Sequence, residues 1–298
     1  MTRIHIITLG GLRIEQDGEE LRDLPAQPVR CALFLYLALE RSATRDELIA
    51  LFWPERDAER ARHSLSQTLY ELRRRPGEDW IESRGERVDV TPRVTADALE
   101  FLAAAESGED EVALARYAGA FLDGCNLGAT PEFEQWVDRR RAQLARLHRD
   151  LCRRLTAARL EQGDPEGALA VARRWAEMDP LDDEAHHRIV ELLAEMGRRA
   201  EALRHFEEYA ELIARELEVE PLEETQALVA RLRAAPPPLP DASPRWSSNP
   251  PASRTTACRS AGCRRACCGS RWRRGPRWDG RGSRARSSAS TCPSRSRP

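Results

Sequence analysis

Hydrophobic and polar positions change their spacing twice in the first hundred residues. Residues 3–9 and 12–16 are short runs with β-branched side chains, and Asp17 and Gly18 form a dipeptide typical of a two-residue hairpin turn. Residues 28–39 are an apolar run without turn residues that is too long for a central strand. The pattern predicts an antiparallel sheet at the start of the chain, followed by a buried helix.

Two more helices are predicted before residue 76. Thr44 and Glu47 have the spacing of a capping box, and Pro54 ends the helix that follows them. Residues 57–75 place apolar side chains three or four positions apart until Pro76 interrupts the pattern. These apolar positions are Ala61, Leu65, Leu69 and Leu72. The third helix is therefore amphipathic, with one face in the core and the other in solvent.

An arginine-rich hairpin follows the third helix. Residues 80–83 and 87–90 have the composition of two short strands around Arg84 and Gly85. Strands, three helices and a closing hairpin are the order of elements in a winged helix-turn-helix. We therefore assign residues 1–97 to a winged-helix domain.

The solvent face of the third helix carries the side chains that bind nucleic acids. Its centre presents Arg60, His63, Gln67, Tyr70 and Arg74, and its flanks present Arg62, Ser66 and Arg73. Arg, Gln, His and Ser are donors that contact base edges and phosphates. An ordinary solvated helix face is the alternative interpretation. The neighbouring hairpin, with Arg84 and Arg87, favours double-stranded promoter DNA as the partner.

The charge of residues 1–97 limits how tightly one copy can bind DNA. This segment contains 15 Arg and 18 acidic residues. Electrostatic affinity is then modest and concentrated on the third helix and the hairpin. This balance argues against a lone monomer as a tight binder and favours a homodimer.

The composition of residues 98–236 is typical of a helical array. It is rich in Ala, Leu, Glu and Arg, and it contains an internal echo with an offset of 34 residues. Gly163 corresponds to Gly197, and Ala168 corresponds to Ala202. A period of 34 residues is that of the tetratricopeptide repeat. We expect a mainly α fold with a small β component: a winged helix-turn-helix, then a tetratricopeptide-like α-helical array, then a disordered tail.

The tail, residues 237–298, has a different composition from the rest of the chain. It holds 14 Arg, 12 Ser, nine Pro and two acidic residues, whereas residues 1–236 hold 33 Arg and 47 acidic residues. Such a segment buries too little apolar surface to offset the entropy of folding. Four of its cysteines, at positions 258, 263, 267 and 268, have a spacing that matches known zinc sites poorly. We favour a frameshift in a longer regulator, with an authentic basic arm as the alternative.

Enzymatic function has no support in the motifs. The chain contains no lysine, which excludes the P-loop lysine and Schiff-base chemistry, and no His-Glu-x-x-His, Gly-x-Ser-x-Gly or glycine-rich phosphate loop occurs. We expect no cofactor and no metal. The longest apolar run, residues 31–39, is too short to span a membrane, and no signal peptide is evident. We therefore expect a cytoplasmic, nucleoid-associated protein whose cysteines at 31, 125 and 152 are reduced.

The order of several short motifs resembles a known family. They are Leu51-Phe-Trp-Pro54, Ala61-Arg62 with Leu65, Leu69 to Arg73, Tyr117 to Leu122, Trp136 with Arg140, Asp179-Pro-Leu181 with Glu184-Ala-His186, Gly197 to Leu203, and Leu217 to Pro221. Together they resemble the SARP family of regulators, in which an OmpR-type winged helix precedes a bacterial transcriptional activator domain. The resemblance covers about four fifths of the chain. His63 departs from it, since many relatives have Asn there.

The resemblance implies a sequence-specific DNA-binding transcriptional regulator. We expect an activator that binds promoter repeats through the winged helix and uses its helical domain for dimerisation or for contact with RNA polymerase or a sigma factor. Two alternatives remain open. One is a protein-binding adaptor whose winged helix no longer contacts DNA, and the other is a truncated form of a larger regulator with an ATPase or another effector module.

Overall fold

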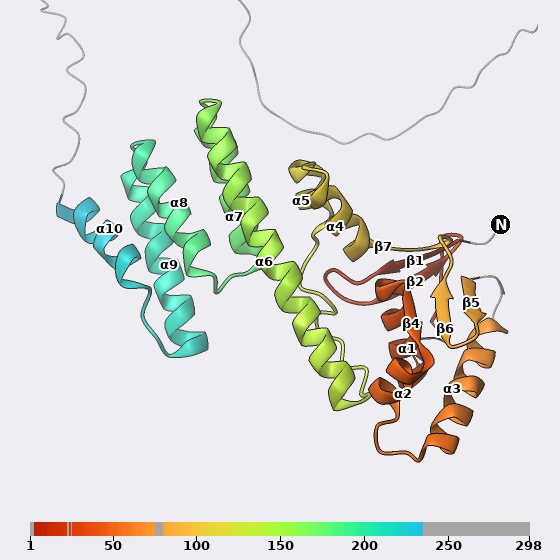
Figure 1. The fold of residues 1–298 in the computed structure, drawn as a ribbon. Helices are drawn as coiled ribbons and strands as arrows, with labels where there is room; N and C mark the ends of the chain where they lie inside the picture. The colour runs from red at the N-terminus through yellow and green to blue at the C-terminus, as the bar shows by residue number, and fades with distance from the viewer. Residues whose placement is uncertain (1–2, 23, 25, 75–79, 235–298) are drawn as a thin grey trace, which may run out of the picture. The chain divides into compact units, whose positions relative to one another are not determined.

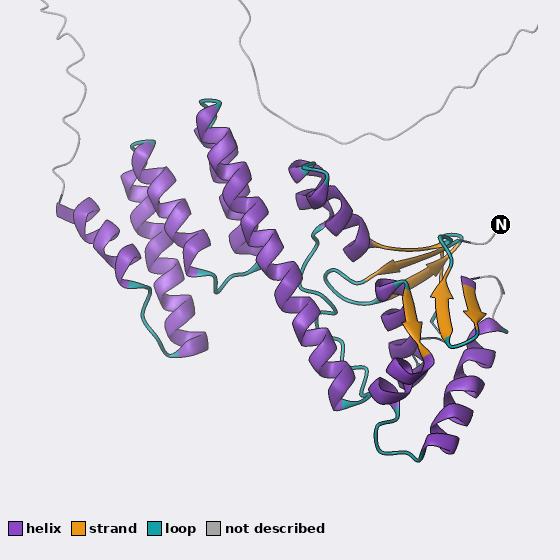
Figure 2. Cartoon of the chain, in the orientation of Figure 1, coloured by secondary structure: helices purple, strands orange, loops and turns teal. Residues whose placement is uncertain are grey.

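The computed structural model describes residues 3–22, 24, 26–74 and 80–234 (Figure 1). Residues 237–298 lie outside these ranges. The predictions about the cysteine cluster, the frameshift and the basic arm all concern this segment. The described part is mainly helical with two small sheets (Figure 2). The predicted fold class, a winged helix-turn-helix followed by an α-helical array, is confirmed for these residues.

A four-stranded sheet of order β3-β2-β1-β7 opens the chain. Its strands are β1 (Ile4–Ile7), β2 (Arg13–Gln16), β3 (Glu19–Glu20) and β7 (Val94–Ala96). Asp17 and Gly18 turn the predicted β2–β3 hairpin with φ angles of 51° and 89°. β7 was not predicted from sequence: it pairs in parallel with β1, where His5 lies opposite Thr95. A strand of three residues is too short to show the alternation of apolar and polar positions that would predict it from sequence.

Three helices follow the first hairpin, as predicted. They are α1 (Pro28–Glu40), α2 (Arg45–Phe52) and α3 (Ala58–Arg73). The predicted capping box is present at the start of α2. The Thr44 hydroxyl accepts a hydrogen bond from the Glu47 amide at 3.2 Å, and the Glu47 carboxylate accepts one from the Thr44 amide at 2.7 Å. These two bonds satisfy amides that the first turn of the helix leaves without partners.

A second sheet, of order β4-β6-β5, lies beside these helices. It consists of β4 (Ser42–Thr44), β5 (Ile81–Arg84) and β6 (Arg87–Val90). The predicted turn at Arg84 and Gly85 is shifted by one residue. Arg84 remains in β5 opposite Arg87, and the turn consists of Gly85, with a φ of 62°, and Glu86. Glycine adopts a positive φ without steric penalty, so the reversal begins there.

The rest of the described chain is helical. The elements are α4 (Asp97–Glu106), α5 (Asp110–Arg116), α6 (Pro131–Glu161), α7 (Pro165–Met178), α8 (Asp183–Glu195), α9 (Arg199–Leu217) and α10 (Glu223–Ala234). From α6 onward each helix packs against the next, and α10 also packs against α8. Gly163 and Gly197, with φ angles of 73° and 74°, follow α6 and α8 at equivalent turns. Ala168 and Ala202 are both fully buried, so the 34-residue echo occupies equivalent structural positions.

Aromatic side chains connect α1 and α2 to α6. The rings of Tyr36 and Trp136 lie 5.1 Å apart, and those of Phe52 and Phe133 lie 5.5 Å apart. The Trp136 indole N–H donates to the Glu40 carboxylate at 2.8 Å. Because the indole N–H has a partner, this large side chain can be buried without an unsatisfied donor. The base of the winged helix is therefore held against the long helix.

Candidate nucleic-acid interface

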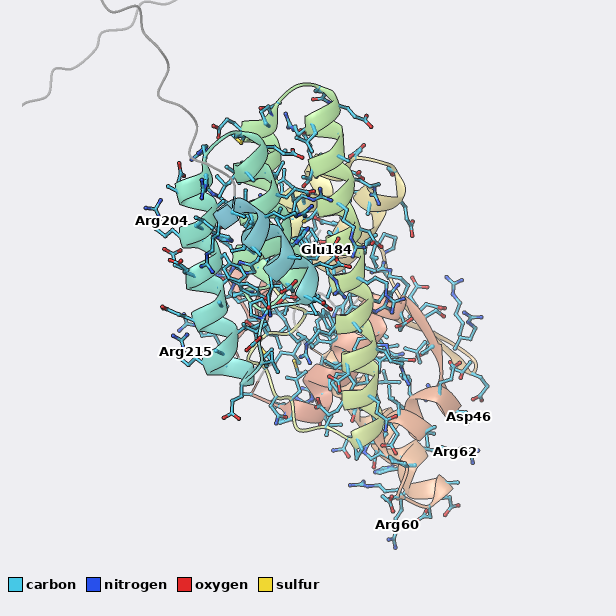
Figure 3. All side chains as sticks on the ribbon, turned by 90° about the vertical axis from the view of Figure 1, so that its left-hand side faces the viewer. Asp46, Arg60, Arg62, Glu184, Arg204 and Arg215 are labelled. Atoms are coloured by element: carbon cyan, nitrogen blue, oxygen red, sulfur yellow. The ribbon has the colours of Figure 1, made fainter. Side chains whose placement is uncertain are left out.

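The apolar stripe of α3 determines which side chains face solvent. Asp57 precedes the helix, and its carboxylate accepts a hydrogen bond from the Arg60 amide at 2.9 Å. The predicted core positions Ala61, Leu65, Leu69 and Leu72 are buried, with at most 1% exposed. Since α1 and α2 pack against α3, the opposite face is presented outward. Figure 3 shows Arg60 and Arg62 extending from the free end of this helix.

Most of the predicted contact residues are exposed. On α3 these are Arg60, Arg62, His63, Ser66, Gln67, Tyr70 and Arg74, and on the hairpin they are Arg84 and Arg87. Arg73 is half-buried. The fold therefore brings nine of the ten candidate residues to the surface on two adjoining elements.

Two of the exposed basic side chains on α3 already have intramolecular contacts. The Arg60 guanidinium lies 3.3 Å from the Asp57 carboxylate, and the Arg74 guanidinium lies over the ring of Tyr70 at 5.6 Å from its centroid. The Arg60 side chain is 84% exposed, so its ion pair with Asp57 is weak and easily exchanged. Tyr70 is 57% exposed, so its ring is accessible on the same face as the neighbouring arginines.

Three other side chains on this face have no internal partner. Among the described residues, Arg62, His63 and Ser66 form no hydrogen bond or ion pair. Gln67 donates to the Glu71 carboxylate at 3.3 Å, a long contact on an exposed surface. The face and its flanks therefore present side chains that a ligand can engage without first breaking a strong internal bond.

The hairpin, or wing, is anchored to the body of the domain. Arg87 donates to the Ser42 hydroxyl at 2.7 Å, while Arg84 is paired with Glu82 at 2.7 Å on the outer surface. Arg45, at the start of α2, reaches the turn: its amide donates to the Glu86 carbonyl at 2.8 Å and its Nε donates to the Gly85 carbonyl at 3.3 Å. The tip of the wing is thus fixed relative to α2.

Arg73 connects α3 directly to the wing. Its guanidinium donates to the hydroxyl of Ser83 in β5. The sequence pattern predicts that Arg73 lies on the flank of the DNA-binding face. In the fold the half-buried Arg73 also holds α3 against the wing through this contact with Ser83.

Two further arginines belong to this surface and were missed from the sequence. Arg56 lies in the turn before α3 and donates to the Ser64 hydroxyl at 2.7 Å, and Ser64 in turn donates to the Arg60 carbonyl at 2.9 Å. Arg45 contacts the wing tip, as described above. A signal for Arg56 existed, since it directly precedes the capping residue Asp57. No sequence pattern links Arg45 to residues 40 positions away.

The described residues contain no other site of evident chemistry. Within ranges 3–22, 24, 26–74 and 80–234, no cluster of three or more His, Cys, Asp or Glu side chains could hold a metal ion. None of the described helices is long and apolar enough to cross a bilayer. Burial raises the pKa of the Cys31 and Cys152 thiols to about 12, which keeps both protonated and poorly nucleophilic.

Comparisons with known proteins bear on the helical region and on the fold. Residues 93–233 match the family described as the bacterial transcriptional activator domain (BTAD), so β7 falls within the match. Among solved structures, the chain is similar to Mycobacterium tuberculosis EmbR in complex with a low-affinity phosphopeptide, with a TM-score of 0.53 and 19% identity. This similarity covers 78% of this chain and 65% of the EmbR chain, so the chain spans less than two thirds of EmbR. No curated protein matches the chain.

The two matches answer different questions. At 19% identity, the likeness to EmbR shows a shared fold. The family match from residue 93 to residue 233 identifies the helical array that follows the winged helix. Residues 93–233 of the chain are therefore similar to the bacterial transcriptional activator domain, and the described part of the chain shares the fold of EmbR.

Proposed function

We propose that the chain is a transcriptional regulator of the SARP type that binds double-stranded promoter DNA through an OmpR-type winged helix. In this proposal α3 enters the major groove, where each base pair presents a distinct pattern of donors and acceptors. The wing, carrying Arg84 and Arg87, contacts the flanking backbone or minor groove. The protein works in the cytoplasm on the nucleoid, and it acts as an activator.

The observation that carries the proposal is that three exposed polar side chains of α3 have no internal partner. Arg62, His63 and Ser66 have no internal partners among the described residues, although the opposite side of the helix is fully packed. A rigid helix with free donors loses little conformational freedom when it binds. Residues on the centre of the face, such as Gln67 and Arg74, would contact bases. Those on its flank, such as Arg62, would contact phosphates.

The charge balance favours a paired arrangement of two winged helices. Residues 1–97 carry three more acidic residues than arginines, which reduces the electrostatic affinity of one copy. Binding of two copies to adjacent half-sites raises the overall affinity through effective concentration. We therefore propose that the helical domain serves homodimerisation or contact with RNA polymerase or a sigma factor.

Alanine substitutions on α3 test the DNA-binding proposal. Replacing Arg60, Gln67 and Arg74 together should weaken specific binding, by about 1 to 3 kcal/mol for each bidentate base contact. Arg22→Ala is the matched control, because the Arg22 side chain is also 84% exposed and pairs with a nearby acid, but it lies outside the proposed interface. Footprinting on promoter regions around the gene measures both affinity and register. Wild-type affinity in the triple variant would refute the assignment.

A comparison of fragments separates the regulator from a protein-binding adaptor. Residues 1–97, 1–236 and 1–298 should be compared by footprinting at two salt concentrations. We expect sequence preference to be weak in the first fragment and complete in the second. Residues 237–298 should add only salt-sensitive, sequence-independent affinity. Absence of preference in all three would favour the adaptor, and preference that requires residues 237–298 would refute the proposed roles of the domains.

A further inference from the structure

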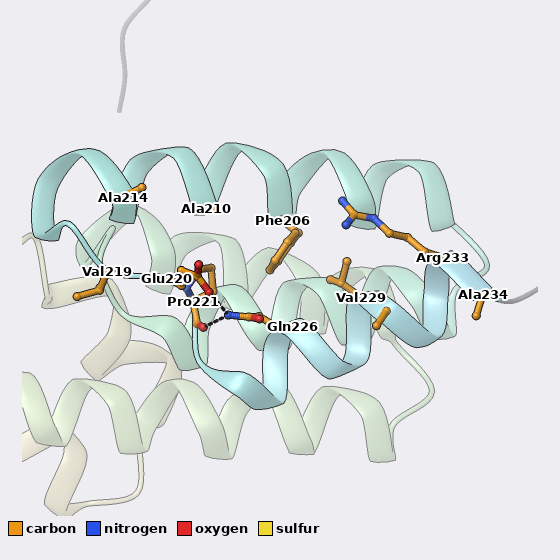
Figure 4. Close-up of a pocket in the computed structure, with 11 residues that line it drawn as sticks. Phe206, Ala210, Ala214, Val219, Glu220, Pro221, Gln226, Val229, Arg233 and Ala234 are labelled. Carbon is orange, nitrogen blue, oxygen red and sulfur yellow. Dashed lines mark hydrogen bonds between the residues drawn. The ribbon is translucent and has the colours of Figure 1, made fainter.

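An apolar groove lies between the last two described helices, α9 and α10 (Figure 4). Its volume is about 750 Å³. Phe206, Ala210 and Ala214 line one wall on α9, and Val229 and Ala230 line the other wall on α10. The three residues of α9 are four positions apart, so they form one stripe along the helix. The groove is therefore an apolar depression between two helices, of a size that can bind a ligand or a segment of another chain.

Large apolar side chains are also exposed at the end of the groove near residue 220. Leu217, at the end of α9, is 50% exposed, Val219 is 48% exposed and Leu222 is 61% exposed. These are three of the six large hydrophobic side chains that are exposed among the described residues. Val219 lines the groove, and Leu217 continues the stripe of Ala214 one turn further. Single exposed apolar residues are common, but a cluster beside an apolar groove is typical of a binding surface.

The loop that carries these side chains is fixed by hydrogen bonds. The Leu222 amide donates to the Asp183 carboxylate of α8 at 3.1 Å. The Gln226 side-chain amide donates to the Pro221 carbonyl at 2.8 Å and to the Glu220 carboxylate at 3.2 Å (Figure 4). A surface that is ordered before binding loses less conformational entropy when it binds. The exposed apolar side chains are therefore presented in a preformed arrangement.

Acidic side chains border the apolar surface. On α9 they directly follow the lining residues, on the loop one lines the groove, and on α10 one lies a helical turn before Gln226. These acidic residues, which we call the acidic rim, are Glu207, Glu211, Glu220 and Glu223, and all four are exposed. Arg233 also lines the groove, but its guanidinium is paired with Glu207 at 3.1 Å. Residues 207–224 as a whole contain eight acidic residues and one arginine, so the border of the groove is negative.

Apolar walls with an acidic border are complementary to an amphipathic helix with basic flanks. Such a helix packs its apolar stripe into the groove, and its Lys or Arg side chains reach the carboxylates at the border. From Phe206 to Leu217 the stripe on α9 is about 16 Å long at about 1.5 Å per residue, which matches roughly three turns of a bound helix. A second copy of the same surface would place one acidic rim against another, and a nucleic acid would place phosphates against it. Both arrangements are electrostatically unfavourable.

We propose that the groove between α9 and α10 binds a basic amphipathic helix of a partner protein. Phe206 and Val219 contact the apolar stripe of this helix, and Glu211 and Glu223 contact its basic flanks. The inference rests on the proposed function, because it specifies the partner contact that we assign there to the helical domain. The partner surface lies on α9 and α10, whereas the DNA-binding surface lies on α3 and the wing, so each can be changed without altering the side chains of the other.

A labelled synthetic helix tests the proposal on the full chain. The peptide has about 14 residues, with Leu at helical positions i, i+3, i+4 and i+7 and Lys elsewhere, and the control peptide has Glu in place of Lys. In fluorescence anisotropy the Lys peptide should bind about tenfold more tightly than the Glu peptide, and added salt should weaken its binding. Ala214→Gln, which fills an exposed position of the groove wall, should weaken binding about tenfold. The matched control Ala142→Gln, at an exposed position of α6, should not.

Charge reversal separates this contact from general attraction to an acidic protein. Glu211→Arg combined with Glu223→Arg should weaken binding of the Lys peptide about tenfold and strengthen binding of the Glu peptide. Glu161→Arg combined with Glu195→Arg changes the net charge by the same amount at the exposed last residues of α6 and α8, and should change both affinities little. Circular dichroism checks that every variant is folded. Footprinting reports DNA binding separately, so failure of the groove proposal is distinguishable from failure of the DNA-binding proposal.

The other outcomes contradict the proposal. Equal affinity for the two peptides, or no binding of the Lys peptide, would show that the groove does not select a basic helix. Wild-type binding in Ala214→Gln would place the peptide elsewhere on the protein. Equal losses in the two charge-reversed variants would indicate non-specific attraction. A dimer in sedimentation velocity that dissociates in Ala214→Gln would identify a second copy as the occupant instead.

Discussion

Replacement of Asp97 should separate the first sheet from the helical region. Asp97 is the first residue of α4, and its carboxylate accepts hydrogen bonds from the Thr8 amide at 2.8 Å, the Thr8 hydroxyl at 2.6 Å and the Leu9 amide at 2.9 Å. Thr8 is fully buried. Asp97→Ala leaves three donors without their acceptor, so the variant should be strongly destabilised.

The size of the effect follows from the number of donors and their access to water. A hydrogen bond to a charged group contributes about 1.5 to 3 kcal/mol, which for three donors gives an upper range of about 4.5 to 9 kcal/mol. A cavity of about 500 Å³ adjoins Asp97 and Leu9, and water entering it can replace part of the lost bonding. We therefore expect a loss of about 3 kcal/mol in the free energy of unfolding.

Urea denaturation followed by circular dichroism measures this loss as a shift of the midpoint at constant slope. Asp138→Ala is the matched control, because Asp138 is 72% exposed and pairs with Arg141 on the surface of α6. The control should change stability by less than about 0.5 kcal/mol. If both variants had the same stability, the hydrogen bonds of Asp97 would not be what joins the sheet to α4.

Four further substitutions have predictable effects on stability. Burial lowers the pKa of His148 from its usual 6.5 to about 4, so the folded state binds fewer protons than the unfolded state between these values, and stability falls as the pH falls. His148→Phe, which keeps an aromatic ring against Tyr117, should remove about 2 kcal/mol of the loss between pH 7 and pH 5 in parallel urea titrations. Ala168→Leu and Ala202→Leu should each destabilise the array by about 1 to 3 kcal/mol in thermal melts, and wild-type stability in both would refute the equivalence of the two turns. Thr44→Ala should remove about 1 kcal/mol by abolishing the capping box, and an unchanged urea midpoint would contradict this role.

The candidate interface could be predicted where it depends on helical periodicity. A spacing of three or four residues between Ala61, Leu65, Leu69 and Leu72 determines which side of α3 is buried, and so which side is exposed, whatever the rest of the chain does. The internal partners of the exposed residues could not be predicted. Ser83 contacts Arg73, and Arg45 reaches the wing turn, only because the second sheet brings β5 and β6 beside α2 and α3.

The same distinction holds for the fold as a whole. The amino-acid sequence alone determined the elements with local signals: the turn at Asp17 and Gly18, the capping box, the long helices and the 34-residue echo. Only the tertiary structure decided that Val94–Ala96 pairs with the first strand and that Ser42–Thr44 pairs with β6. A strand of three residues has too few positions for an apolar period, and its stability comes from hydrogen bonds to partners about 45 or 90 positions away along the chain. Such pairings depend on how the intervening helices pack, and this packing cannot be predicted from the local sequence.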